Sequence, residues 1–162
     1  MREREATGLE QAMRQTEAEH FDLAALLRLQ TASLRSLYPD TEIELDGANQ
    51  TVTLLGAPDL VGQALDKLVG NAMDFRRPGT AVRIGCRLDD HSVHLAVDND
   101  GPPLPTDVDV FQSMTSGRQG RQQEPHLGLG LFIVRLIAEF HGGQATARNL
   151  PGGVSVEISL PR

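Results

Sequence analysis

The sequence predicts an α+β fold in which a sheet carries helices on one face. Three stretches have the apolar periodicity of helices, and alternating stretches between them have that of strands. The strands come in consecutive pairs, each pair preceded by a helix, which indicates neighbouring antiparallel strands. The chain has 162 residues, which suits one domain, and 40% of them are hydrophobic, which is enough for a core.

The first half of the chain predicts a helix, a hairpin and a longer helix. Asp22 is suited to cap a helix that ends before Pro39. Strands are expected over residues 42–46 and 51–55, joined by the turn signal Asp46-Gly47. The clearest helix spans Pro58–Phe75, because its apolar residues recur in pairs every four positions and form one broad face.

The second half predicts two more strand pairs with a helix between them. Strands over 80–88 and 92–97 precede a polar, Gly- and Pro-containing stretch over 101–127, which is long enough to be functional or disordered. A helix over 128–140 stops at a glycine pair, and strands over 144–149 and 154–160 form a last hairpin.

Residues 1–19 are mostly charged or polar and support two interpretations. Leu9 and Met13 are four positions apart and could pack on a partner helix, as the end of a longer helix would. The alternative is a solvated tail.

Composition excludes several classes of protein. The formal net charge of −7 argues against nucleic acid as a partner, although one nucleotide needs only a local positive site. Cys86 is the only cysteine, so neither an intrachain disulfide nor a cysteine-based metal cluster can form. No run predicts a membrane span or a secretion signal.

Polar residues on the long helix form the first candidate site. At 100° per residue, Lys67, Asn71 and Asp74 fall on one flank of the apolar stripe, and Asp66 falls on the other. At such an edge a side chain is half sheltered and can still reach a ligand. The alternative is that these residues only border a buried helix.

Two further motifs carry glycines. In Val97-Asp98-Asn99-Asp100-Gly101 a strand runs into acids, an amide and a glycine that lets a ligand approach the backbone. In His126-Leu127-Gly128-Leu129-Gly130-Leu131 two glycines open a helix whose first N–H groups favour phosphate. Arg118 and Arg121 precede it and could bind a terminal phosphate. Alone, the first motif also fits an ordinary strand-end turn, and the second fits a flexible loop joined to a core helix.

Together, in this order, the motifs resemble those of sensor histidine kinases. Residues 68–72 resemble the N box, 99–102 the G1 box and 128–131 the G2 box, and Phe111 to Met114 lies where the family has its F box. The resemblance covers roughly residues 22–161. It implies the Bergerat fold of the GHKL superfamily, a two-layer α/β sandwich. In that fold a mixed, mostly antiparallel sheet carries three helices on one face.

The resemblance also implies roles for individual residues. ATP would lie under a lid over about 106–127, with Asn71 coordinating Mg²⁺, Asn99 contacting the adenine amino group and the G2 glycines along the phosphates. Catalytic roles would fall to Lys67, Asn71 and Arg118. The expected ATP-binding residues are Asn71, Asp74, Phe75, Asn99, Gly101, Leu104, Arg118, Arg121, Leu127, Gly128, Leu129, Gly130 and Leu131.

Two departures from the family pattern bear on binding and catalysis. Asn99 stands where the family has aspartate, and its oxygen can still accept from adenine, while Asp98 and Asp100 could partly substitute. Lys67 stands four positions before Asn71, where an amide or acid is usual. A protonated lysine cannot act as a base, but it could hold a phosphate or stabilise charge in the transition state.

The remaining departures lie in the loops. Pro103 and His126 replace family glycines, and Gln112 and Ser113 replace an acid and a proline of the F box.

The resemblance implies a kinase catalytic domain over 20–162 that passes the γ-phosphate of ATP to a histidine outside this chain. Residues 1–19 would be the tail of a dimerisation helix or a linker. The nearest histidine to that tail, His20, lacks the surroundings of a phospho-acceptor.

The implied partners are the dimerisation domain and a response regulator, with no nucleic acid. The parent protein would be a membrane-anchored homodimer with this domain in the cytoplasm, and the isolated domain a monomer. The alternatives are a degenerate nucleotide-binding module that acts by docking, and a stand-alone serine kinase or ATPase of the anti-sigma type.

Overall fold

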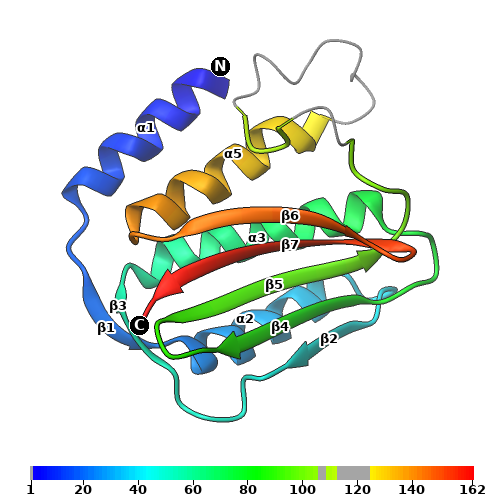
Figure 1. The fold of residues 1–162 in the computed structure, drawn as a ribbon, viewed down its shortest axis with the longest axis horizontal. Coiled ribbons are helices and arrows are strands. Elements are labelled where there is room, and N and C mark those ends of the chain that lie inside the picture. The colour runs from blue at the N-terminus through cyan, green and yellow to red at the C-terminus, as the bar shows by residue number, and fades with distance from the viewer. Residues whose placement is uncertain (1, 106–108, 113–124) are drawn as a thin grey trace.

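The computed structural model describes the backbone of residues 2–105, 109–112 and 125–162, and the side chains of 8–105, 109–112 and 130–162. This part of the chain forms four helices and seven strands (Figure 1). They are α1 (Arg2–Gln15), β1 (Glu19–Asp22), α2 (Leu23–Leu37), β2 (Ile43–Asp46), β3 (Thr53–Gly56), α3 (Pro58–Phe75), β4 (Val82–Leu88), β5 (Ser92–Asp100), α5 (Pro125–Phe140), β6 (Gln144–Leu150) and β7 (Gly153–Pro161). Each of α2, α3 and α5 is followed by two strands.

A five-stranded sheet of order β2-β4-β5-β7-β6 forms one layer, and α2, α3 and α5 form the other (Figure 1). The β2–β4 pair is parallel, and the other pairs in this sheet are antiparallel. Along β5, Val93, Leu95 and Val97 are buried and alternate with half-buried residues, as expected for a sheet covered on one face. The two-layer fold class is confirmed.

The predicted hairpin over residues 42–55 is wrong. β2 pairs with β4, with Ile43 opposite Val82, and β3 pairs with β1 in a separate two-stranded sheet. Gly47 has a φ of 82°, and a Cβ there would overlap the carbonyl oxygen of Cys86. The turn after β2 therefore packs closely against the backbone of β4, the strand with which β2 pairs. β1 has only four residues and no clear alternation, and the sequence analysis did not identify it.

Asp22 joins the small sheet to the helical layer. Its Oδ1 accepts from the backbone N–H of Ala24 at 3.0 Å, which is the predicted cap of α2, and from that of Val52 at 2.9 Å. Chiefly because of the Val52 bond, the pKa of this carboxyl is lowered. One side chain therefore fixes both the start of α2 and the approach to β3.

Helix α1 (Arg2–Gln15) is folded onto the domain, and its assignment to the tail of a dimerisation helix or to a linker stays a prediction. Met13 is only 6% exposed, Leu9 is partly buried against the same core, and α1 packs on α5 (Figure 1).

The limits of the other elements follow the sequence pattern closely. α3 spans the predicted residues, while β5 continues to Asp100 and α5 begins at Pro125.

Candidate functional site

The predicted motifs meet at one end of the α3–α5 pair. The two helices run in opposite directions, so the last turns of α3 and the first turns of α5 lie at the same end (Figure 1). The end of β5 joins them there, because the backbone N–H of Arg77 donates to the carbonyl of Asp100 at 2.6 Å. Gly101 is needed at this junction, since a Cβ on it would overlap the carbonyl oxygen of Phe75.

Asn71 is the most informative residue of this end. Its side chain is 5% exposed, and Oδ1 has no hydrogen-bond partner among the described residues. A buried polar atom without a partner is costly and rare, and functional sites are one place where it is found. An amide oxygen is also a donor that Mg²⁺ accepts. Asn71 is thus poised for a ligand that would supply the missing contact.

The neighbours of Asn71 on α3 differ in exposure. Lys67 is half-buried one turn earlier, and Asp74 is exposed almost one turn later. Phe75 is partly buried against the core. Asp66 lies on the opposite flank, as predicted, where Gln30 of α2 donates to it at 2.8 Å.

Asn99 lies on the helix-facing side of β5. It is 2% exposed, and its Nδ2 donates to the carbonyl of Asp100 at 3.2 Å. The suggestion that Asp98 or Asp100 could replace it is wrong, because successive residues of a strand point to opposite faces. Asp100 instead pairs with Arg83 on the other face at 3.3 Å.

Asn149 is a site-forming residue that the sequence analysis missed. Its Oδ1 accepts from the N–H of Leu104 at 2.8 Å, and its Nδ2 donates to the carbonyl of Leu104 at 3.3 Å. The amide therefore ties the segment after β5 to β6. An asparagine just before Pro151 is typical of a turn, so nothing in the pattern indicated this long-range contact.

Phe111, at the start of the F box, and the two residues before it are held next to α5. Val110 and Phe111 are buried, and Asp109 accepts from the N–H of Phe111 at 2.9 Å and lies 4.0 Å from Arg135 of α5. A cavity of about 380 Å³ lies between this turn and β6, lined among others by Leu104 and Phe111.

Several predicted residues lie outside the described part of the chain. These are Arg118, Arg121, Ser113, Met114 and most of the expected lid. The backbone of His126, Leu127, Gly128 and Leu129 is described within α5, but the surroundings of their side chains are not. Of the G2 box, Gly130 is half-buried and Leu131 is fully buried in the core. A Cβ on Gly130 would meet no heavy atom of the described residues within 4 Å apart from the backbone of its own helix, so among those residues the helix surface is open at that point.

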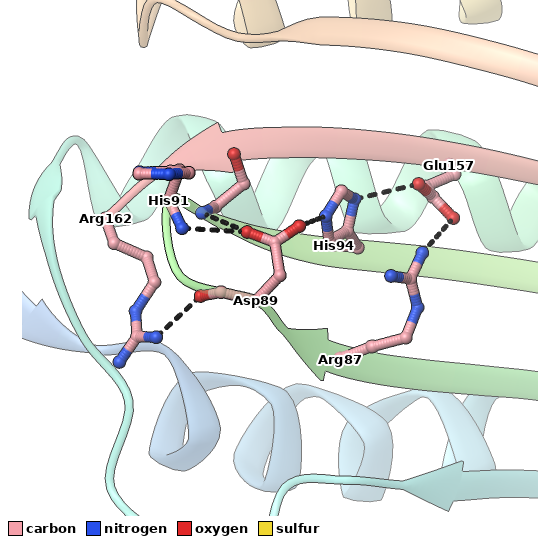
Figure 2. A network of polar contacts seen from close by, with 7 residues as sticks. Arg87, Asp89, His91, His94, Glu157 and Arg162 are labelled. Carbon is pink, nitrogen blue, oxygen red and sulfur yellow. Dashed lines mark hydrogen bonds and ion pairs between the residues drawn. The ribbon is translucent and has the colours of Figure 1, made fainter.

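A second polar cluster lies on the sheet face that is turned away from the three helices (Figure 2). The ring of His94 lies between the carboxylates of Asp89, at 2.7 Å, and Glu157, at 3.0 Å, and Arg87 reaches Glu157 at 3.4 Å. The His94 contact lowers the pKa of Asp89. Among the described residues no group of histidine, cysteine or acidic side chains is arranged to hold a metal ion. This cluster joins strands and does not form a second candidate site.

Comparison with known proteins agrees with this geometry. Residues 56–162 match the family described as histidine kinase-, DNA gyrase B-, and HSP90-like ATPase. Sensor histidine kinase CusS of Escherichia coli O157:H7 is 30% identical over 131 residues, which cover 78% of this chain and 27% of the relative. Signal transduction histidine-protein kinase AfsQ2 of Streptomyces coelicolor is 36% identical over 101 residues, covering 60% and 18%. The chain thus spans about a quarter or less of these relatives.

A solved structure extends the likeness to three dimensions. The ATP-binding domain of PrrB from Mycobacterium tuberculosis superposes with a TM-score of 0.69 at 26% identity, covering 90% of this chain and 98% of that one. None of the described helices here is both long and apolar enough to cross a membrane. The chain belongs to the histidine kinase-, DNA gyrase B- and HSP90-like ATPases, and the curated relatives that it resembles here are histidine kinases.

Proposed function

We propose that this domain binds Mg-ATP at the end of the α3–α5 pair and transfers the γ-phosphate to a histidine of a dimerisation domain. The observation that carries the proposal is the buried Oδ1 of Asn71, which has no partner among the described residues. Mg²⁺, when bound with the nucleotide, would neutralise phosphate charge. The family membership supports ATP as the ligand.

Different residues at this end would bind different parts of the nucleotide. Asn71 would hold the metal through its amide oxygen, and Asn99, fixed on a central strand, would accept from the adenine amino group. The open surface at Gly130 would admit the phosphates near the start of α5. Phosphoryl transfer depends mainly on such positioning and on charge stabilisation. The roles given to Arg118 and Arg121 and to a lid over 106–127 stay predictions.

The proposal extends to the whole protein of which this domain would be a part. Helix α1 would continue a dimerisation helix, and residues 20–162 would be the catalytic unit that it carries. A response regulator would then accept the phosphoryl group. The parent protein would be a membrane-anchored homodimer with this domain on the cytoplasmic side, and the domain alone would be a monomer.

The decisive experiment is a calorimetric titration of the domain with ATP and Mg²⁺, on the natural chain and on Asn71→Ala. We expect micromolar affinity, about −8 kcal/mol, and its loss in the variant. Asn49→Ala is the control, because Asn49 is exposed in the loop between β2 and β3, outside the α3–α5 pair. Absence of binding by the natural chain at millimolar nucleotide would refute the proposal.

Transfer is tested separately by supplying the dimerisation domain of a related kinase with radiolabelled ATP. Phosphohistidine that forms with the natural chain and not with Asn71→Ala supports a kinase. Tight nucleotide binding without transfer to any supplied dimerisation domain would instead indicate a module that acts by docking.

A further inference from the structure

The four residues after β5, Gly101 to Leu104, form a strap whose two ends are both held by the β6–β7 hairpin. At its start, the backbone N–H of Gly101 donates to the carbonyl of Gly152 at 3.0 Å. At its end, both backbone polar groups of Leu104 are bonded to the side-chain amide of Asn149, at 2.8 and 3.3 Å. The hairpin thus fixes each end of the strap separately.

The middle of the strap is stiff and has no backbone donor. Pro102 and Pro103 lack an N–H, so Gly101 and Leu104 supply the only N–H groups of the strap, and both are used. Each proline also fixes its own φ at about −65°. A short segment with two fixed torsions and two held ends has few conformations to lose when a ligand binds.

The strap borders the residue to which the adenine contact is assigned. Asn99 is 2% exposed, and its Nδ2 donates to the carbonyl of Asp100 at 3.2 Å. A Cβ built on Gly101 would lie 3.3 Å from that Nδ2, so the start of the strap packs against the amide. From the hairpin, a Cβ on Gly153 would overlap the carbonyl oxygen of Asn99. The hairpin therefore holds both Asn99 and the strap beside it.

We propose that Asn149 is a positioning residue of the nucleotide site. By binding both backbone groups of Leu104, it keeps the strap, stiffened by its two prolines, in the conformation that the adenine end of a nucleotide requires. The inference rests on the proposed function, and Asn149 acts through the strap without touching the nucleotide. Because the strap borders Asn99, the effect should be equal for nucleotides that differ only in their number of phosphates.

The test measures ATP and ADP affinities by calorimetry, with Mg²⁺, for the natural chain, Asn149→Ala, Pro103→Gly and the double variant. Asn149→Ala should weaken binding about fivefold, the effect of about one neutral hydrogen bond, and by the same factor for both nucleotides. Pro103→Gly alone should weaken it about twofold, because Asn149 still holds the strap. The double variant should lose more than the product of these factors, since each constraint partly compensates for loss of the other.

Thr146→Ala is the matched control, because it removes an exposed polar side chain from the same strand, and it should bind as the natural chain does. The amide hydrogen of Leu104 should exchange faster in Asn149→Ala, which reports release of the strap. Unchanged affinity in Asn149→Ala, or a loss restricted to ATP, would overturn the inference and leave the proposed function standing. Failure of the natural chain to bind either nucleotide would instead overturn the proposed function.

Discussion

The two ends of the α3–α5 pair differ in whether their buried polar groups have hydrogen-bond partners. At the closed end, His141 donates from Nδ1 to the carbonyl of Ile137 at 2.8 Å and accepts at Nε2 from the N–H of Ala57 at 3.0 Å. At the other end, the buried amide oxygen of Asn71 has no partner among the described residues. One helix pair thus has an end completed by its own side chains and an end that a ligand would complete.

The closed end holds the pair together without contributing to the site. Nε2 of His141 can accept only when it carries no proton, so the bond from Ala57 requires a neutral ring protonated on Nδ1. The ring also fills the space next to Gly56, where a Cβ would overlap it. Stability and binding should therefore be separable by substitutions at the two ends.

The largest effect is expected from His141→Ala. The variant leaves the N–H of Ala57 and the carbonyl of Ile137 without their side-chain partner, which should lower the free energy of unfolding by about 1–3 kcal/mol. Nucleotide affinity, measured well below the unfolding temperature, should change by less than about twofold. His91→Ala, which alters an exposed turn residue, serves as the control. A large loss of affinity in His141→Ala with an intact fold would show that the two ends are coupled.

A smaller effect of opposite sign is expected from Asn71→Leu. Replacing a buried amide that has an unpartnered oxygen by an apolar side chain of similar size should raise the free energy of unfolding of the unliganded domain by about 1 kcal/mol. Nucleotide binding should be lost at the same time. Urea denaturation and calorimetry on the same samples measure both. Lower stability would mean that water satisfies Asn71 in the free domain.

The smallest effect concerns pH and the sheet face without helices. The pKa of Asp89 is lowered first by His94 and then by the N–H groups of His91 and Ser92 (Figure 2). Its stabilising contribution is therefore present above the unfolded-state pKa of about 3.9 and is lost as the pH falls below it. Urea denaturation at pH 7 and pH 3 should show a smaller difference for Asp89→Asn than for the natural chain. Asp90→Asn, at the exposed neighbour, should leave that difference unchanged.

The periodicity of apolar residues was enough to predict those helices and strands that bury one face in the core. Helix α3 and the strands of the main sheet follow from apolar residues at helical or alternating spacing, and the cap at Asp22 follows from its side chain. Strand pairing between distant segments did not follow. The parallel partner of β2 and the existence of β1 depend on contacts that local pattern does not contain.

In the candidate site, too, local motifs could be predicted from the sequence and long-range contacts could not. Asn71 and Asn99 were identified from their motifs, and the structure adds that one has a partnerless buried oxygen and that the other sits inside a central strand. Asn149 was missed, because its bonds to Leu104 span 45 residues. The role of His141 could not be predicted from the sequence either, because its hydrogen bond with the N–H of Ala57 joins residues that are 84 positions apart.

The parallel pairing of β2 with β4 has a consequence for folding kinetics. Between these strands the chain must pass through β3 and the whole of α3 before it can return in the same direction. Helix α3 is thus part of the crossover, and we expect the pairing of β2 with β4 to form together with the docking of this helix. The segment that carries Lys67 and Asn71 therefore takes part in assembling the domain, and substitutions along it should alter the rate of folding as well as the affinity for a ligand.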